Sequence, residues 1–289
     1  MVRGRRLPLP VVLTMAMVAL IIGGFVLITS RSVTNYTNPS GPKFEADYAG
    51  GQPPFDGTLK AITWNIAFAE NIDQAITTLH DTEELQDADI LMLQEMDETG
   101  TEQIASALGY NYVYYPASIH SRNGKNFGNA ILSRWPIVDS AKIILPHKNP
   151  SNNQIRTATE ATIDVDGQLI PVYSVHTETF WLGPQQRKDQ IETLAQEVGL
   201  TLAGEADYAV IGGDFNTLTP DSLATLASIL ENAGLEWISR DVGETVDKVG
   251  LGVILDHIFA SNMTPLSSGV FTETSASDHY PVWTILNLD

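Results

Sequence analysis

The sequence predicts a mixed α/β domain of two packed sheets with helices outside them, preceded by a membrane helix. Three observations carry this prediction. Apolar runs of strand type alternate with segments of helical periodicity from Leu59 onward. An Asp166-Gly167 hairpin signal joins two of the strand runs. Near the N-terminus, an apolar run without charges follows three arginines. Mixed strands and helices with hairpins are typical of two sheets with outer helices.

Composition limits the class of protein. The chain has 289 residues, of which 43% are hydrophobic and 18% charged, so it can bury a full core. Its formal net charge of −19 argues against a broad basic surface for nucleic acid. A bound divalent metal can still supply local positive charge. Because there is no cysteine, disulfides, thiolate metal sites and cysteine nucleophiles are excluded.

Residues 1–30 are predicted to form an N-terminal transmembrane anchor. Arg3, Arg5 and Arg6 precede an uncharged run whose core, Val11 to Ile28, reaches the lower length limit of a spanning helix. Positive charges on the leading side favour its retention in the cytoplasm, so we expect the catalytic domain on the extracytoplasmic side. The alternative is a signal sequence, with secretion after cleavage, although no clean small-x-small cleavage site ends the run.

Residues 31–58 are predicted to be a linker or a loosely packed arm. This stretch is rich in glycine, proline and asparagine and has no periodic apolar pattern. The folded domain is therefore expected at 59–289, and it shows no internal repeat.

Within that domain the strand candidates are short runs rich in β-branched and other apolar residues. They are 60–66, 90–94, 112–115, 129–133, 137–144, 157–165, 169–175, 209–214, 254–259 and 282–286. The helix candidates are 72–79, 82–86, 101–108, 185–202 and 220–233.

Three of the helix candidates carry specific signals. Gly109 follows 101–108 as a cap. The segment 185–202 places Ile191, Leu194 and Val198 at helical spacing. For 220–233, Thr219 is a suitable N-cap before Pro220.

The stretch from Ala209 to Thr217 is an apolar strand that ends in Asp214 and Asn216. Because strand residues two apart point to the same side, both polar side chains can face one site. Gly212 and Gly213 let another backbone or a ligand come close. The alternative is a turn that merely closes the strand, for which Asp and Asn are common residues.

Other polar residues also follow or end apolar strand runs. They are Asn65, Glu95, His176, Asp256 with His257, and Asp278 with His279. One such residue is usually a cap, but caps do not account easily for a whole set. Carboxylate and amide oxygens suit a hard cation such as Mg²⁺, and histidines beside carboxylates suit proton transfer or phosphate contact.

These residues sit in motifs that resemble the endonuclease/exonuclease/phosphatase superfamily of DNase I-like, metal-dependent phosphoesterases. The motifs, in the family's order, are TWNI at 63–66, LQEMD at 93–97, GNAILSRWPI at 128–137, YSVH at 173–176, GDFN at 213–216, LDHIF at 255–259 and SDHYPV at 277–282. The resemblance implies a four-layer α/β/β/α sandwich with two mainly antiparallel sheets.

The resemblance also implies a metal site. Glu95 is similar to the main ligand of Mg²⁺, for which Mn²⁺ is an alternative, and Asn65 assists it. Asp278 is similar to a second metal-site carboxylate.

Roles in the reaction follow from the same resemblance. Asp214 matches the residue that orients or deprotonates the attacking water. His279, oriented by Asp256, matches the histidine that stabilises charge on the phosphate. Three further matches concern the phosphate and the leaving group: Asn216 and Arg156 as phosphate contacts, and His176 as a phosphate contact or acid.

One position departs from the family. In DNase-like members the histidine that matches His176 leans on a carboxylate near residues 128–129, where this chain has Phe127. Glu178 or a backbone carbonyl is the expected replacement. Phe180 and Trp181, which follow, are either core anchors or a lip for a lipid or nucleobase.

The predicted function is nuclease-like hydrolysis of phosphodiester bonds by metal-assisted attack of water. The alternatives are a sphingomyelinase, phospholipase C-type or phosphoinositide phosphoesterase and, more remotely, a non-catalytic membrane-tethered binding module. The expected partners are a phosphodiester substrate, from nucleic acid or a phospholipid head group, and the membrane. Nothing in the sequence indicates an obligate protein partner.

Overall fold

The computed structural model describes residues 33–204, 206–248 and 251–288. The predicted anchor at 1–30 lies outside these ranges. Among the residues that are described, no helix is both long and apolar enough to cross a membrane.

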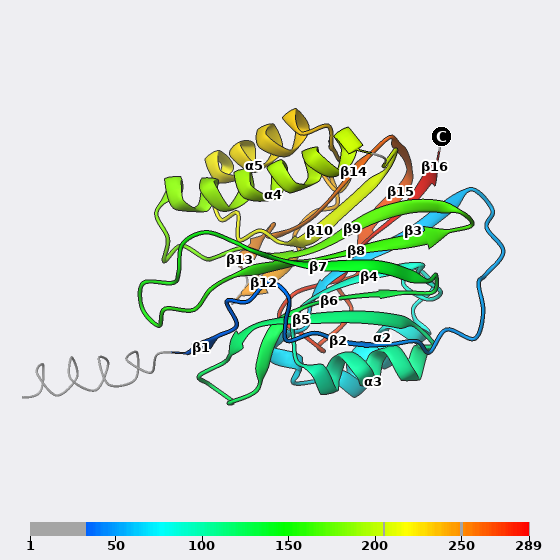
Figure 1. Ribbon diagram of the computed structural model, residues 1–289, viewed down its shortest axis with the longest axis horizontal. Helices are drawn as coiled ribbons and strands as arrows, with labels where there is room; N and C mark the ends of the chain where they lie inside the picture. The colour runs from blue at the N-terminus through cyan, green and yellow to red at the C-terminus, as the bar shows by residue number, and fades with distance from the viewer. Residues whose placement is uncertain (1–32, 205, 249–250, 289) are drawn as a thin grey trace, which may run out of the picture.

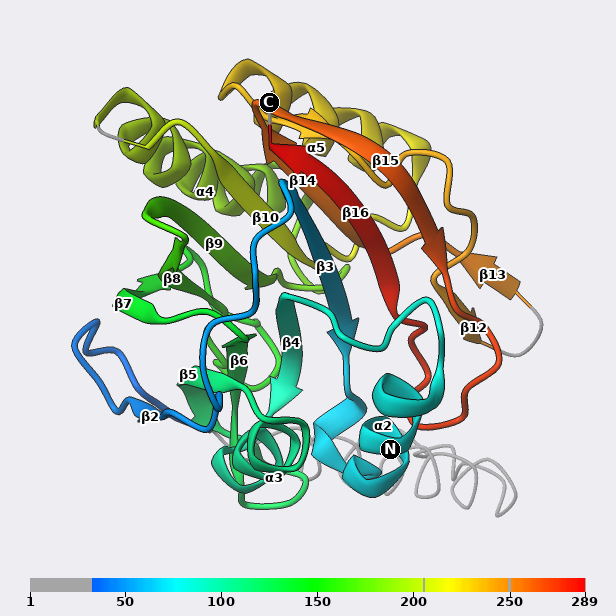
Figure 2. The same cartoon turned by 90° about the vertical axis from the view of Figure 1, so that its right-hand side faces the viewer.

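Two sheets lie face to face, with helices on both outer sides (Figure 1). In the described residues the first sheet runs β1-β5-β6-β4-β3-β16-β15, with β2 also paired to β5. Its strands are β1 (Thr34–Asn35), β2 (Phe44–Ala46), β3 (Thr58–Asn65), β4 (Ile90–Met96), β5 (Asn111–Ile119), β6 (Asn126–Ser133), β15 (Met263–Val270) and β16 (Val282–Leu288). In Figure 2 its strands β3, β16 and β15 lie towards the viewer.

The second sheet runs β11-β14-β10-β9-β8-β7 in the described part of the chain. Its strands are β7 (Ile137–Ile144), β8 (Thr157–Val165), β9 (Gln168–His176), β10 (Ala209–Asp214), β11 (Glu236–Trp237) and β14 (Asp256–Ser261). A separate hairpin joins β12 (Val246–Lys248) and β13 (Leu251–Val253).

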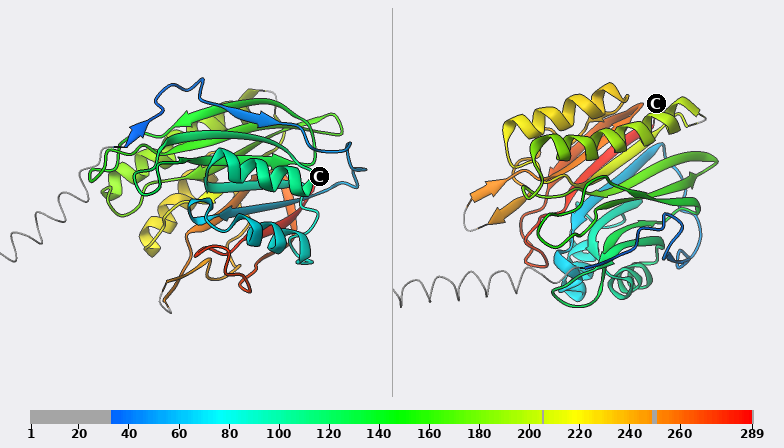
Figure 3. Two further views of the ribbon diagram at one scale, coloured as in Figure 1. Left: turned by 90° about the horizontal axis from the view of Figure 1, so that it is seen from below. Right: turned by 60° about the vertical axis from the view of Figure 1, so that its left-hand side comes forward.

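The helices divide between the outer faces (Figure 3). On the first sheet lie η1 (Ala67–Ala69), α2 (Ile72–Asp81) and α3 (Glu98–Leu108), and on the second sheet lie α4 (Pro184–Gly204) and α5 (Pro220–Asn232). Apolar clusters fill the space between the sheets and the space under each helix pair. Since both faces of most strands are covered, their sequences read as continuous apolar runs rather than alternating ones.

The helix ends follow their sequence signals. Asp97 caps α3 by accepting a hydrogen bond from the Gly100 amide, and Gly109 ends the helix in a left-handed conformation. Thr219 caps α5 ahead of Pro220. The predicted helix at 82–86 is wrong, because that segment forms turns in which the amide of Gln86 bonds to the Thr82 carbonyl.

The predicted linker at 31–58 is a packed arm where the structure describes it. Its strands β1 and β2 both pair with β5. Phe44 packs against Tyr114 and Phe55 against Trp135, each with ring centroids 5.9 Å apart. The Lys142 ammonium donates to two carbonyls of the arm. These contacts come from isolated side chains, which leave no periodic pattern in the sequence.

Two parallel strand pairs determine where the site lies. β3 pairs in parallel with β4, and β9 pairs in parallel with β10. A helix connects the strands of each pair, α2 for the first and α4 for the second, as a parallel connection requires. Side chains of the two strand pairs meet in the interface between the sheets. The carboxyl ends of all four strands therefore lie at one edge of the molecule.

Candidate active site

The site forms where the two parallel pairs end. Asn65 is the last residue of β3, and Asp214 is the last residue of β10. The Asn65 Nδ2 donates to Asp214 Oδ2 at 3.1 Å, which links the two sheets. Gly212 allows the close approach, because a Cβ there would lie 2.6 Å from the terminal methyl of buried Met92. Asp214 therefore ends its strand, as the sequence predicted, and lies beside Asn65 from the other sheet.

Asp214 is buried and surrounded by hydrogen-bond donors. Its Oδ1 accepts the backbone amide of Asn216 at 2.9 Å. Its Oδ2 lies 3.5 Å from the Nε2 of His176 and 3.8 Å from the Nε2 of His279. Burial raises the pKa of Asp214 to about 7, against the opposing effect of the charge on His279.

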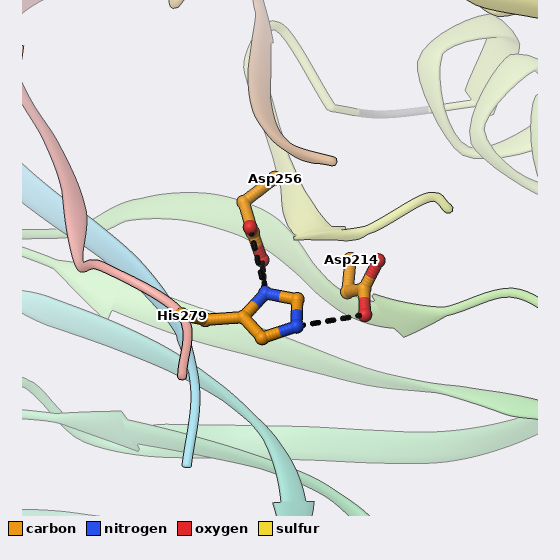
Figure 4. Close-up of side chains that lie close together, drawn as sticks. All are labelled: Asp214, Asp256 and His279. Carbon is orange, nitrogen blue, oxygen red and sulfur yellow. Dashed lines mark hydrogen bonds and ion pairs between the residues drawn. The ribbon is translucent and has the colours of Figure 1, made fainter. Parts of the chain in front are cut away.

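His279 lies between two carboxylates (Figure 4). Its Nδ1 is 2.9 Å from Asp256 Oδ2, while its Nε2 faces Asp214. Burial by itself would lower the pKa of His279, but Asp256 and Asp214 outweigh it and raise the pKa to about 10. The imidazole is therefore protonated at neutral pH and carries a proton on both nitrogens.

Further hydrogen bonds hold Asp256 and His279 in place. Thr245 donates its hydroxyl to Asp256 Oδ2 at 2.7 Å. The indole of Trp64 donates to the His279 carbonyl at 2.9 Å. Ser277 donates to the Asn65 carbonyl at 2.6 Å, which fixes the loop before β16 against β3. Thr245 lies outside the motifs, so nothing in the sequence pointed to it, and Trp64 lies within TWNI but had no assigned role.

Glu95 lies beside Asn65 in a strained part of the backbone. It interrupts the pairing of β4 with β6 and has φ of 59°. Ala67, Phe68 and Ala69 have φ of 37°, 61° and 52°. Non-glycine residues in this region cost on the order of 1 kcal/mol or more each, and such strain concentrates at functional sites. The strained turn directs the Phe68 amide to Glu95 Oε2 and the Ala67 amide to Asn65 Oδ1, both at 3.1 Å.

The residues predicted to bind metal suit a hard cation. Burial raises the pKa of Glu95, while the charges of Arg156 and His279 lower it. A bound cation would offset the cost of burying this carboxylate. Glu95 and Asn65 offer oxygen ligands of the kind that Mg²⁺ prefers. Asp278 is exposed and lines a cavity of about 460 Å³ next to Phe68.

Asp214, Asp256 and His279 also lie close enough together to suggest a metal group. Their hydrogen bonds fit a proton-carrying chain better. A histidine that is protonated on both nitrogens has no lone pair for a metal, and Asp256 already accepts from His279 and Thr245.

Arg156 and His176 complete the site from the second sheet. The Arg156 Nη1 lies 3.2 Å from both ring nitrogens of His176, and its Nε donates to Glu178 Oε2 at 3.1 Å. Burial would raise the pKa of Glu178, but the Arg156 guanidinium outweighs it and lowers that pKa. Glu178, one of the expected partners of His176, contacts Arg156, which in turn contacts His176. The spacing of His176 and Glu178, two residues apart, could have indicated that they share a side.

Asn216 also belongs to this arrangement, while His257 does not. Asn216 has φ of 50°, and its Nδ2 donates to the Thr177 carbonyl at 3.1 Å. His257 points away from the site, as strand alternation requires for the neighbour of Asp256. It packs among Phe215, Trp237 and Phe259, with its Nε2 2.8 Å from the Thr217 hydroxyl.

Comparison with known proteins matches residues 62–279 to the endonuclease/exonuclease/phosphatase family. A UPF0294 protein of Vibrio cholerae is 25% identical over 231 residues, which are 78% of this chain and 77% of that protein. One from Vibrio vulnificus is 30% identical over 117 residues, so the match spans 40% of this chain and only 39% of that relative.

Solved structures share the fold. A D. rerio TDP2 complexed with a single-strand DNA product matches with a TM-score of 0.63 and 18% identity, over 80% of this chain and 100% of that one. A mannosyl-6-phosphatase of Bacteroides thetaiotaomicron matches with a TM-score of 0.60 and 17% identity, over 79% and 99%. At these identities the likeness supports the fold and leaves the substrate open.

Proposed function

Since this chain belongs to the endonuclease/exonuclease/phosphatase family, we propose that it is a metal-dependent hydrolase that cleaves phosphodiester bonds by attack of water. The observation that carries the proposal is the buried chain Asp256–His279–Asp214, which ends beside the amide of Asn65. A purely structural strand end has no need of a protonated histidine between two buried carboxylates, because burying such charges is costly.

Asp214 is the proposed acceptor of the water proton. Its Oδ1 is held by the Asn216 amide, so the carboxylate is fixed in orientation before the substrate arrives. Its Oδ2 faces the same space as His176 and His279, where a phosphate would sit. A carboxylate placed in this way can orient a water and take its proton.

Donors around the same space would stabilise the phosphate. His279, Arg156 and Asn216 present N–H groups from three separate segments next to strand ends, and the donors are already held in place by protein partners. Fixed donors of this kind stabilise the charge that develops on the equatorial oxygens. His176, beside Arg156, is the proposed donor to the leaving oxygen.

Glu95 and Asn65 would hold the Mg²⁺ or Mn²⁺, with Asp278 at the rim. The ion would neutralise phosphate charge and make water a stronger nucleophile. The protein's part is to keep both ligands rigid, which the strained turn at 67–69 does by donating an amide to each.

Two kinds of substrate remain as candidates. Nucleic acid is the nuclease-like one. A lipid head group is favoured by Phe180 and Trp181, which are 63% and 49% exposed and stack with ring centroids 5.2 Å apart. They lie in the loop between β9, which ends in His176, and α4. Exposed aromatic pairs of this kind suit a membrane interface, and the net charge of −19 disfavours a polyanion.

The test is a parallel assay of the full chain with Mg²⁺ against plasmid DNA, sphingomyelin vesicles and a phosphoinositide. We expect hydrolysis of at least one substrate, with loss of activity in excess EDTA and recovery on addition of Mg²⁺ or Mn²⁺. Undiminished hydrolysis in EDTA would rule out the metal dependence. Absence of hydrolysis in every arm would favour the remote alternative, a binding module without turnover.

A further inference from the structure

A cavity of about 290 Å³ adjoins the candidate site on the side of the second sheet. It lies between the N-terminal ends of α4 and α5, which run side by side over that sheet (Figures 1 and 3). Thr177 and Asn216 form its wall towards the site, and Ile191 and Phe215 are apolar members of its lining. The mechanism proposed above leaves this space without a use.

The wall of the cavity is directly connected to the catalytic groups. Asn216 donates its Nδ2 to the Thr177 carbonyl, and its backbone amide donates to Asp214 Oδ1. Thr177 also follows His176 in the chain, and its own amide donates to the Asp214 carbonyl at 3.0 Å. An organic group bonded to a phosphate beside Asp214 and His176 can therefore extend past Asn216 into this space.

Thr177 supplies an independent sign of a ligand. Thr177 is 1% exposed, and its Oγ1 has no hydrogen-bond partner in the described part of the chain. Buried hydroxyls normally have a partner, so an unsatisfied one in a cavity wall calls for an explanation. A bound group with its own hydroxyl would provide that partner.

The rest of the lining narrows the chemistry of the ligand. Arg187 donates a hydrogen bond from its Nη1 to the Leu182 carbonyl at 2.8 Å and has further N–H donors on its guanidinium. Thr225 on α5 adds a hydroxyl whose proton goes to the Asp221 carbonyl, so its oxygen can still accept. Apolar lining residues together with separate polar groups suit a small ring that carries several hydroxyls. An acyl chain would leave these polar groups unpaired, which is unfavourable.

We propose that this cavity binds a hydroxylated ring, a sugar or a cyclitol, that is esterified to the phosphate in the candidate site. The proposal rests on the proposed phosphoesterase function, since it places the phosphate beside Asp214. It adds the substrate class, which is a ring phosphate taken from solution or from a lipid head group. Thr177 and Arg187 are the residues assigned to recognise the ring.

Binding tests this assignment without depending on turnover. Each protein is the full chain carrying Asp214→Asn, with Mg²⁺ present, so that the probe stays intact. The probes are glucose 1-phosphate, which carries the ring, and inorganic phosphate, which lacks it. We expect glucose 1-phosphate to bind about tenfold more tightly than inorganic phosphate, the ratio that roughly 1.4 kcal/mol of ring contacts would give.

Two substitutions on neighbouring positions of α5 locate the ring. Thr225→Phe fills the cavity and should remove the tenfold advantage of glucose 1-phosphate while leaving the affinity for inorganic phosphate unchanged. Ala224→Phe is the matched control, because Ala224 is exposed on the same helix and does not line the cavity. Thr177→Val removes only the unpaired hydroxyl and should weaken the binding of glucose 1-phosphate by several-fold. This variant replaces Thr225→Phe if that protein does not fold.

A lipid arm separates the two sources of the ring. Vesicles with phosphatidylinositol are compared with vesicles with phosphatidylglycerol, which has the same charge and no ring. If the protein prefers phosphatidylinositol vesicles but not glucose 1-phosphate, and Thr225→Phe removes this preference, the ring belongs to a lipid head group. If the protein prefers glucose 1-phosphate over inorganic phosphate in solution, the ring belongs to a sugar phosphate.

The outcomes that overturn the proposal are distinct from a failure of the proposed function. If inorganic phosphate binds but the ring adds nothing in either format, or if Thr225→Phe keeps the advantage, the cavity assignment is wrong and the phosphoesterase proposal stands. If no probe binds at all, the phosphate site itself is wrong and both proposals fall.

Discussion

Asp256 acts in this arrangement through His279. Its carboxylate is completely buried, accepts from Thr245 and His279, and holds the imidazole with its Nε2 towards Asp214. The resemblance of the LDHIF and SDHYPV motifs to those of the family predicted this pairing of Asp256 with His279. It did not predict that His176 would lean on Arg156, because the contact depends on how β8 and β9 lie side by side.

His257 shows how the fold separates two neighbouring residues. Burial lowers the pKa of His257 to about 3, so it stays neutral in the folded protein at neutral pH. Its Nε2 contacts Thr217, while its Nδ1 has no partner among the described residues. The unfolded chain takes up a proton near pH 6.5, which the folded protein does not do.

This difference predicts a pH dependence of stability. Because the unfolded state binds more protons between pH 6.5 and 3, the stability contributed by neutral His257 is complete above pH 6.5 and is lost as the pH falls towards 3. The loss should reach about 1.4 kcal/mol per pH unit. His257→Gln keeps a hydrogen-bonding group for Thr217 without a titrating group, so its free energy of unfolding should fall less between pH 6.5 and 5. Equal slopes for wild type and variant in urea titrations would contradict this assignment.

At the scale of elements, the sequence predicted the long helices and the buried strands but missed the edges. β15 was not predicted, because it is an edge strand in which exposed Leu266 and polar residues break the apolar pattern. For the same reason the sequence predicts only a linker or a loosely packed arm at β1 and β2, since these strands are short and only partly buried. Edge pairing depends on partners far away in the chain, and local patterns do not carry that information.

The close contact of the two sheets gives a prediction on a single strand. In β10, Gly212→Ala places a methyl 2.6 Å from the Met92 methyl and 3.1 Å from the Thr63 Cβ, so buried side chains must shift. We expect a loss of ~1–3 kcal/mol in the free energy of unfolding. Gly199→Ala in α4 is the control, because its Cβ meets open space and alanine favours a helix by ~0.5–1 kcal/mol. A Gly212→Ala protein as stable as wild type in denaturant would contradict the proposed tight contact between the sheets.

At the scale of the whole molecule, the position of the site follows from one feature. Two βαβ units, β3-α2-β4 and β9-α4-β10, pack face to face. Each unit contributes polar residues at the carboxyl ends of its strands, and the second adds Arg156 from the adjacent β8 side. The sequence could predict the two layers of strands and most site residues from motifs. It could not predict the cavity beside Asn216, whose walls come from separate helices.

The orientation of the molecule at a membrane remains a proposal from the N-terminal sequence. Three arginines before the apolar run predict that the domain lies outside the cytoplasm. Protease added to intact cells with a permeable outer barrier should therefore degrade the domain and leave a cytoplasmic control protein untouched. Protection of the domain to the same degree as the control would reverse the proposed topology.

Asp214 is the proposed catalytic base, and one substitution tests this role directly. Asp214→Asn keeps the shape of the side chain and its acceptor for the Asn216 amide but cannot take a proton from water. With Mg²⁺ and one phosphodiester substrate, we expect turnover to fall by at least ~10²-fold while the melting temperature stays close to that of wild type. Asp73→Asn, at an exposed position of α2, should leave the rate unchanged. A folded Asp214→Asn protein with the wild-type rate would mean that Asp214 only closes its strand, since asparagine serves that role equally well.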